Sequence, residues 1–84
     1  FNPLMDNQSI IKFFQQPALV GTFLKEMSNY LRFNTDMRIC NLLVKGIQMH
    51  GEKLKELEKA ALIYNALKMN SNNQALLTIK QDLI

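Results

Sequence analysis

The segment from residue 52 to residue 84 carries the pattern that most restricts the fold of this chain. Its apolar residues recur at three- and four-residue steps, stop at a polar corner and then resume. The first series is Leu54, Leu57, Ala61, Tyr64 and Leu67, and the second is Leu76, Ile79 and Leu83. Such spacing places side chains on one side of an α-helix. The segment therefore predicts two helices that form an antiparallel hairpin with its corner at residues 70–74.

Helical spacing also dominates the rest of the chain. Only three glycines and two prolines interrupt it, and no stretch alternates between apolar and polar residues as a half-exposed strand would. A length of 84 residues suits one domain. We therefore expect a single all-α domain over residues 1–84, built as a small irregular bundle of four to five helices. Because the sequence begins at Phe1 and not at Met, we expect a fragment, a processed product or part of a longer chain.

Capping signals suggest where the first two helices begin. Asn2 and Pro3 predict the start of the first helix, because Asn is a favoured N-cap and Pro suits the first helical position. Pro17 ends that helix and starts the second, which ends near residues 33–34. The expected apolar side of the second helix is Leu19, Val20, Phe23, Leu24, Met27, Tyr30 and Leu31. Its opposite side is Gly21, Lys25, Ser28, Asn29 and Arg32.

Similar signals bound the third helix. Thr35 is the expected N-cap, with Asp36 in the first turn, where the helix dipole favours negative charge. The expected buried face is Ile39, Cys40, Leu43, Val44 and Ile47. Gly51 is expected to end this helix in a left-handed conformation, so that a fourth helix starts at about Glu52. One long helix through Gly51 is the alternative.

The corner of the hairpin carries its own signals. Ser71 and Gln74 have the spacing of a capping box, which predicts that the fifth helix starts there and runs to the end of the chain. Asn70 is expected to end the fourth helix, because Asn tolerates left-handed backbone angles.

Two short stretches are similar to known families. Residues 61–75 read Ala-Leu-Ile-Tyr-Asn-Ala-Leu-Lys-Met-Asn-Ser-Asn-Asn-Gln-Ala and resemble the second half of a tetratricopeptide repeat, with Ser71 where proline is usual. Residues 2–17, from Asn-Pro-Leu-Met to Gln-Pro, resemble the proline-punctuated helices of STI1-type co-chaperone domains. Each resemblance covers less than a third of the chain. Both families are helical protein-binding modules, so both resemblances imply a protein partner.

Composition argues against several function classes. The single histidine, His50, and the single cysteine, Cys40, lie about 15 Å apart along one predicted helix, so they cannot form a catalytic pair. No metal-ligand spacing or phosphate-binding loop is present, so we expect no enzyme, cofactor, metal or small-molecule substrate. No apolar run approaches the roughly 20 residues of a membrane span. A lone cysteine favours a reducing, cytoplasmic compartment.

Apolar residues away from the main helix faces point to a protein partner or to self-association. Leu42 and Met49 stand off the main arc of the third helix, and Leu62 and Met69 stand off that of the fourth. Each pair is seven residues apart, which is the spacing of a helical stripe. We expect these four side chains to dock on another protein, in an adaptor, a chaperone-like binder or a subunit of an assembly.

The alternative function is DNA binding by a small helix-turn-helix domain. Arg38, Asn41, Lys45 and Gln48 form a polar stripe on the third helix, and these residue types read base edges. However, the net charge is only +3, from ten basic and seven acidic residues. The most charged stretch, residues 52–59, mixes both signs, as a solvated helix face does. Nucleic acid is therefore the less favoured partner.

Overall fold

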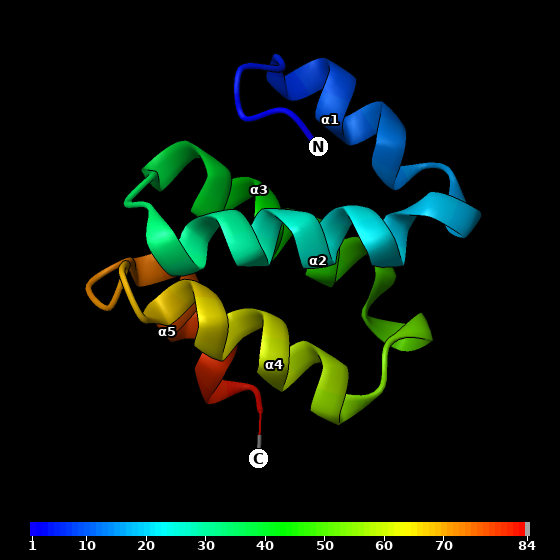
Figure 1. Ribbon diagram of the computed structural model, residues 1–84. Coiled ribbons are helices and arrows are strands. Elements are labelled where there is room, and N and C mark those ends of the chain that lie inside the picture. The colour runs from blue at the N-terminus through cyan, green and yellow to red at the C-terminus, as the bar shows by residue number, and fades with distance from the viewer. Residues whose placement is uncertain (84) are drawn as a thin grey trace.

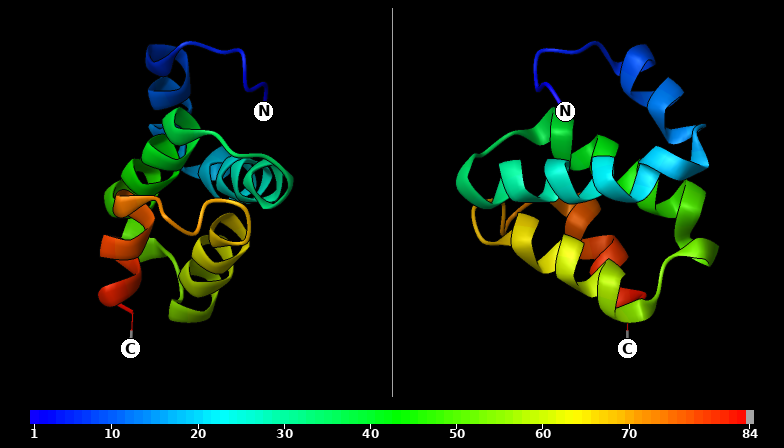
Figure 2. Two further views of the ribbon diagram at one scale, coloured as in Figure 1. Left: turned by 90° about the vertical axis from the view of Figure 1, so that its left-hand side faces the viewer. Right: turned by 45° about the vertical axis from the view of Figure 1, so that its right-hand side comes forward.

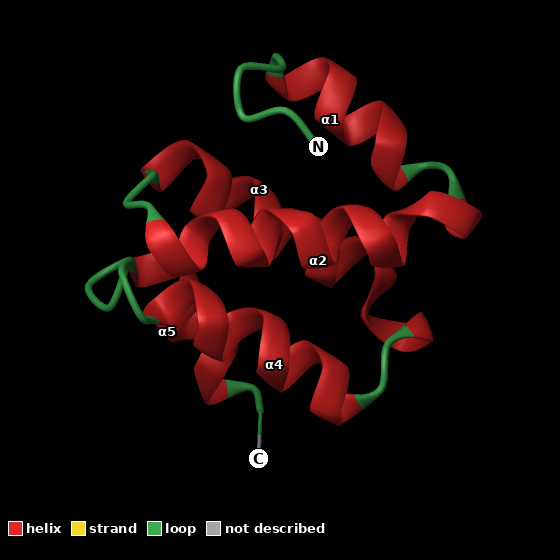
Figure 3. Cartoon of the chain, in the orientation of Figure 1, coloured by secondary structure: helices red, strands yellow, loops and turns green. Residues whose placement is uncertain are grey.

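The structure, a computed structural model that describes residues 1–83, is built from helices alone in that part of the chain (Figures 1 and 3). In chain order these are α1 (Asn7–Phe14), α2 (Pro17–Phe33), α3 (Met37–His50), the short 3-10 helix η1 (Gly51–Lys53), α4 (Glu56–Leu67) and α5 (Gln74–Gln81). The predicted all-α bundle with a C-terminal hairpin is confirmed.

The helices form two layers with a cover at one end. Figure 2 shows α2 above α4 in one layer and α3 above α5 in the other, while α1 packs against α2 and α3 along the upper edge of the two layers. Helix α5 returns along α4 in the opposite direction, as the hairpin prediction requires. The outer face of the α2–α4 layer has no further layer over it among the described residues.

The core lies between the two layers, and α3 contributes the most to it. The largest fully buried apolar side chains are Phe14, Ile10, Leu24, Met27, Leu31, Ile39, Leu43, Ile63, Leu76 and Cys40. The predicted buried face of α3 is confirmed, because all five of its residues are buried. On α2 the prediction holds except at its ends, where Leu19 is exposed and Tyr30 is half-buried.

Two predicted helix starts were displaced along the chain. Helix α1 begins at Asn7 rather than near Pro3, and its N-cap is Asp6, whose Oδ1 accepts from the Ser9 amide at 2.7 Å. Asn2 instead caps a local turn by accepting from the Leu4 amide. The N-cap of α3 is Asp36, not Thr35, and it accepts from the Ile39 amide at 3.1 Å. In both cases a carboxylate caps the helix, and the positive end of the helix dipole also stabilises its negative charge.

The boundary between the third and fourth helices lies at Gly51, but its geometry differs from the prediction. Gly51 has φ −57° and ψ −33°, which is right-handed and not left-handed. The chain continues into η1 and then extends at Leu54 and Lys55, so α4 begins at Glu56 and not at Glu52. The prediction of two separate helices is confirmed, and a single long helix is excluded.

The hairpin corner is also built differently from the prediction. Asn73 caps α5 by accepting from the Leu76 amide at 3.0 Å, so Ser71 and Gln74 do not form the capping box. No residue other than glycine among residues 1–83 has a positive φ, so Asn70 is not left-handed. Helix α5 ends at Gln81, and the predicted run to residue 84 extends outside the described residues.

Asn70 holds the corner through its side chain. Its Nδ2 lies 3.0–3.1 Å from the carbonyl oxygens of Leu31, Asn34 and Ala66, and its Oδ1 accepts from the Asp36 amide at 3.1 Å. Asn70 is 6% exposed. One buried amide therefore connects the end of α2, the turn into α3 and the end of α4.

Gly46 allows close packing at the centre of the bundle. A Cβ atom at this position would lie 2.6 Å from Leu24 Cδ2 and 2.9 Å from Phe14 Cζ, two fully buried side chains. The absence of a side chain at Gly46 therefore lets α1 and α2 approach α3 closely. Gly21 is the opposite case, because a Cβ there would meet no atom within 4 Å.

We predict that Asn70→Ala lowers the free energy of unfolding by about 2–4 kcal/mol, because it leaves several buried backbone groups without a partner. Asn70→Asp should destabilise the fold to a similar degree, since an oxygen would then face three carbonyl oxygens. The matched control is Asn72→Ala, an exposed position in the same loop, which should change stability by less than about 0.5 kcal/mol. Urea denaturation followed by circular dichroism measures all three, and equal stabilities for Asn70→Ala and Asn72→Ala would contradict this role.

We predict opposite effects of alanine at the two glycines. Gly46→Ala should destabilise the fold by about 1–2 kcal/mol, because overpacking outweighs the gain in helix propensity. Gly21→Ala should stabilise it by about 0.5–1 kcal/mol, since only the propensity gain applies. Thermal unfolding of the two variants checks the sign of each change, and a stabilising Gly46→Ala would show that the core adjusts around the new methyl group.

Candidate functional site

Helix α4 presents to solvent three of the apolar residues that periodicity assigned to its core face, whereas Leu67 is half-buried against the core. Leu57 is 85% exposed and Tyr64 is 49% exposed, and Ala61 between them is also exposed. Leu62, Ile63 and Ala66 are the buried residues of α4 instead. The predicted orientation of this helix about its own axis was therefore wrong.

The physical reason is that α4 is apolar on two sides. Leu57, Ala61 and Tyr64 form one arc, and Leu62, Ile63 and Ala66 form another. The second arc faces α2, where the Ser28 hydroxyl donates to the Leu62 carbonyl oxygen at 2.7 Å. Ser28 was predicted on the polar side of α2, yet it is 1% exposed. Its small side chain lets the two helices approach each other and leaves the first arc outside.

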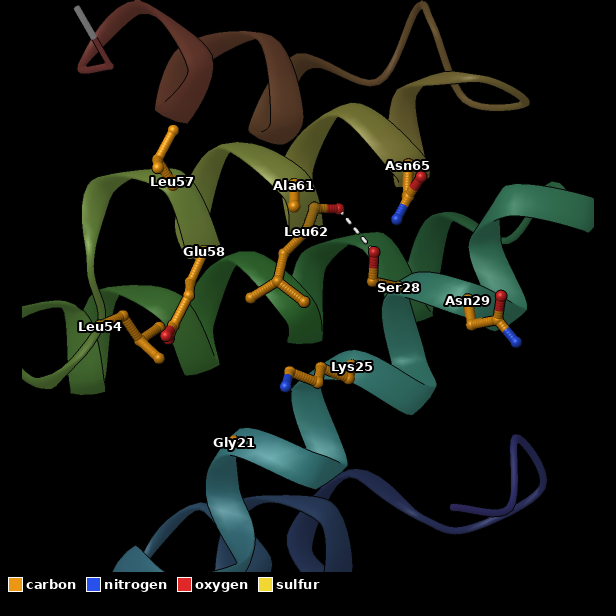
Figure 4. A pocket seen from close by; sticks show the side chains of 10 residues that line it. All are labelled: Gly21, Lys25, Ser28, Asn29, Leu54, Leu57, Glu58, Ala61, Leu62 and Asn65. Carbon is orange, nitrogen blue, oxygen red and sulfur yellow. Dashed lines mark hydrogen bonds between the residues drawn. The ribbon is translucent and has the colours of Figure 1, made fainter.

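A groove runs between α2 and α4 on their outer face. Its volume is about 460 Å³, and it is lined from α2 by Gly21, Lys25, Ser28 and Asn29 and from the other side by Leu54, Leu57, Glu58, Ala61, Leu62 and Asn65. Figure 4 shows Leu62 in the middle of the groove, with Leu57 and Gly21 at opposite rims. The floor is apolar, and the polar groups stand at the walls.

The two walls of the groove carry opposite charges. Lys25 lies on the α2 wall and Glu58 on the α4 wall, and both are exposed. Among residues 1–83 neither side chain takes part in a salt bridge or a side-chain hydrogen bond. Asn29 and Asn65 place one amide on each wall beside them. These groups are therefore free to bind a polar partner at the rim of an apolar surface.

The four residues predicted to bind a partner do not form one surface. Leu42 and Leu62 are buried, at 5% and 6% exposure, which contradicts an exposed stripe at these positions. Met49 and Met69 are half-exposed. Leu62 lines the groove, whereas Met69 lies in a separate hollow beside Met37 at the hairpin corner. Leu42 is covered because α3 is packed against α1, α2 and α5, so more of its circumference is buried than periodicity indicated.

The arginine of the predicted DNA-reading stripe is held by hydrogen bonds within the chain. The Arg38 guanidinium donates to the carbonyl oxygens of Met5, at 2.6 Å, and Pro3, and to Asn7 Oδ1 at 2.9 Å. Arg38 thus holds the segment before α1 against α3. The other three residues of the stripe, Asn41, Lys45 and Gln48, are exposed.

The single cysteine and the single histidine both lie on α3. Cys40 is fully buried in the core, as predicted, and burial raises the pKa of its thiol to about 11. At neutral pH it is therefore a neutral thiol and a poor nucleophile. His50 lies at the end of α3, where its Nε2 is buried and has no hydrogen-bond partner among residues 1–83. No group of three or more His, Cys, Asp or Glu within residues 1–83 is placed to hold a metal ion.

Comparisons with known proteins add no relative. No family model, curated protein or solved structure gives a significant match to the chain. Among the described helices none is both long enough and apolar enough to cross a bilayer.

We predict that Ser28→Ala lowers the free energy of unfolding by about 0.5–1.5 kcal/mol, the usual net contribution of one hydrogen bond. Ser28→Leu should cost more, because a larger side chain at this contact must separate α2 from α4. Chemical denaturation gives both values. If Ser28→Leu were as stable as Ser28→Ala, the close contact between the two helices would not depend on the size of this side chain.

Proposed function

We propose that this chain is a non-enzymatic protein–protein interaction module that docks a partner helix in the groove between α2 and α4. The observation that carries the proposal is the exposed apolar arc of α4 beside an apolar groove. Leu57, Ala61 and Tyr64 are exposed although their spacing is that of a packed helix face. An exposed apolar surface with a polar rim is typical of protein interfaces.

The shape of the groove suits a helix. Two neighbouring helices form its walls, so a third helix can lie along it with its apolar residues on Leu54, Leu57 and Leu62. Burying one leucine-sized side chain contributes roughly 1.5–3 kcal/mol before the costs of association. A few such contacts support an adaptor, a chaperone-like binder or an assembly subunit.

The rim of the groove supplies the selectivity. A partner with an acidic residue toward Lys25 and a basic residue toward Glu58 would satisfy both walls, and the reversed helix would meet like charges. The docking surface proposed here replaces the four residues predicted from the sequence, of which only Leu62 lies in the groove.

DNA binding has less support than protein binding. Its arginine, Arg38, is engaged by the segment before α1, and a base-reading arginine needs its guanidinium free. A cytoplasmic location remains part of the proposal, supported by the single cysteine, which is buried as a thiol.

The test is a selection of amphipathic helices from a displayed library on the wild-type chain, with Gly21→Gln as the counter-selection. Gly21 lines the groove and its missing side chain opens into empty space, so Gln there should obstruct the groove without disturbing the core. Selected helices should bind Gly21→Gln at least about tenfold more weakly, which corresponds to the loss of one apolar contact.

The matched control is Ala18→Gln, an exposed position on the same helix outside the groove lining. It should leave the affinity of the selected helices unchanged. Helices that bind wild type, Gly21→Gln and Ala18→Gln equally well would show that the groove is not the docking site.

A further inference from the structure

We infer that the groove also accepts a second copy of this chain, in a two-fold dimer whose axis runs along the groove. This inference rests on the proposed function, because it assigns a partner to the same docking surface. Its basis is that three features of the α2 wall, namely Gly21, Lys25 and Asn29, each have a complement on the opposite wall. A surface of that kind can pair with itself, because in a two-fold dimer each contact occurs twice.

The direction of the helices makes the two walls correspond. Figure 1 shows α2 and α4 running in the same direction along the layer. Their contact is at Ser28 and Leu62. Lys25 lies three residues before Ser28, which places it ~4.5 Å from the contact along α2. Glu58 lies four residues before Leu62, which places it ~6 Å from the contact along α4. The charges therefore lie at nearly the same level on opposite walls.

A two-fold axis along the groove places α2 of each copy opposite α4 of the other. Lys25 of one copy then faces Glu58 of its partner, and the same pair forms a second time across the axis. Both charges lack an ion-pair partner within residues 1–83, so the dimer would satisfy them without breaking an existing contact.

The apolar features match in the same way. Leu57, which is 85% exposed, stands at the α4 rim, and the empty space beside Gly21 stands at the α2 rim (Figure 4). The axis brings Leu57 of each copy toward Gly21 of the other. Asn29 and Asn65, one on each wall, meet in the same arrangement and can exchange amide hydrogen bonds.

The test is a pair of charge reversals in the whole 84-residue chain, studied by sedimentation velocity. Lys25→Glu alone, or Glu58→Lys alone, places like charges in both cross-copy pairs. Each variant should therefore raise the dimer dissociation constant at least about tenfold. In an equimolar mixture of the two variants both pairs again join opposite charges. The mixture should then form a mixed dimer with an affinity close to that of wild type.

The matched controls are Lys45→Glu and Glu52→Lys, which make the same changes in net charge at exposed positions outside the groove lining. They should leave the dimer unchanged, both alone and mixed. Circular dichroism should show the same helicity for all four variants, because all four positions are exposed and none makes a side-chain hydrogen bond within residues 1–83.

Two results would overturn the inference. The first is a wild-type chain that stays monomeric up to about 1 mM, where even a weak specific contact is populated. The second is a dimer that tolerates Lys25→Glu and Glu58→Lys as well as it tolerates the controls. The library selection with Gly21→Gln tests the groove against foreign helices, so each experiment can fail while the other succeeds.

Discussion

The side chain of Asn70 is the contact on which the rest of the structure depends. It connects the end of α2, the turn into α3 and the end of α4 through four backbone groups, and it does so from a buried position. A primary amide has two N–H donors and an acceptor oxygen, so one side chain can serve several backbone groups. Because buried backbone groups need partners, this amide fixes how the two helix pairs join.

The groove follows from that junction. Asn70 and the hydrogen bond from Ser28 to Leu62 hold α2 and α4 together toward their C-terminal ends. Figure 1 shows the two helices separating toward their N-terminal ends. The divergence opens a wedge whose floor is apolar because α4 is apolar on both sides. The position of the proposed docking surface therefore follows from the place where α2 and α4 are held together.

Periodicity predicted the helices well, because a 3.6-residue pattern depends on local sequence alone. It could not show which side of α4 faces the core, because this helix has two apolar arcs, one containing Leu57 and the other Leu62. Only packing against the neighbouring helices decides which arc is buried. The groove residues Gly21 and Lys25 were assigned to the polar side of α2, which was correct but did not indicate a site. The role of Asn70 depends on acceptors up to 39 positions away in the chain, so no local pattern could reveal it.

The burial of Cys40 has a practical consequence. Its thiol lies in the first turn of α3, fully enclosed and held neutral by a pKa of about 11. A reagent can reach it only when the packing around α3 opens. The rate at which this single sulfur atom is modified therefore measures how often the rarest and largest fluctuations of the fold occur.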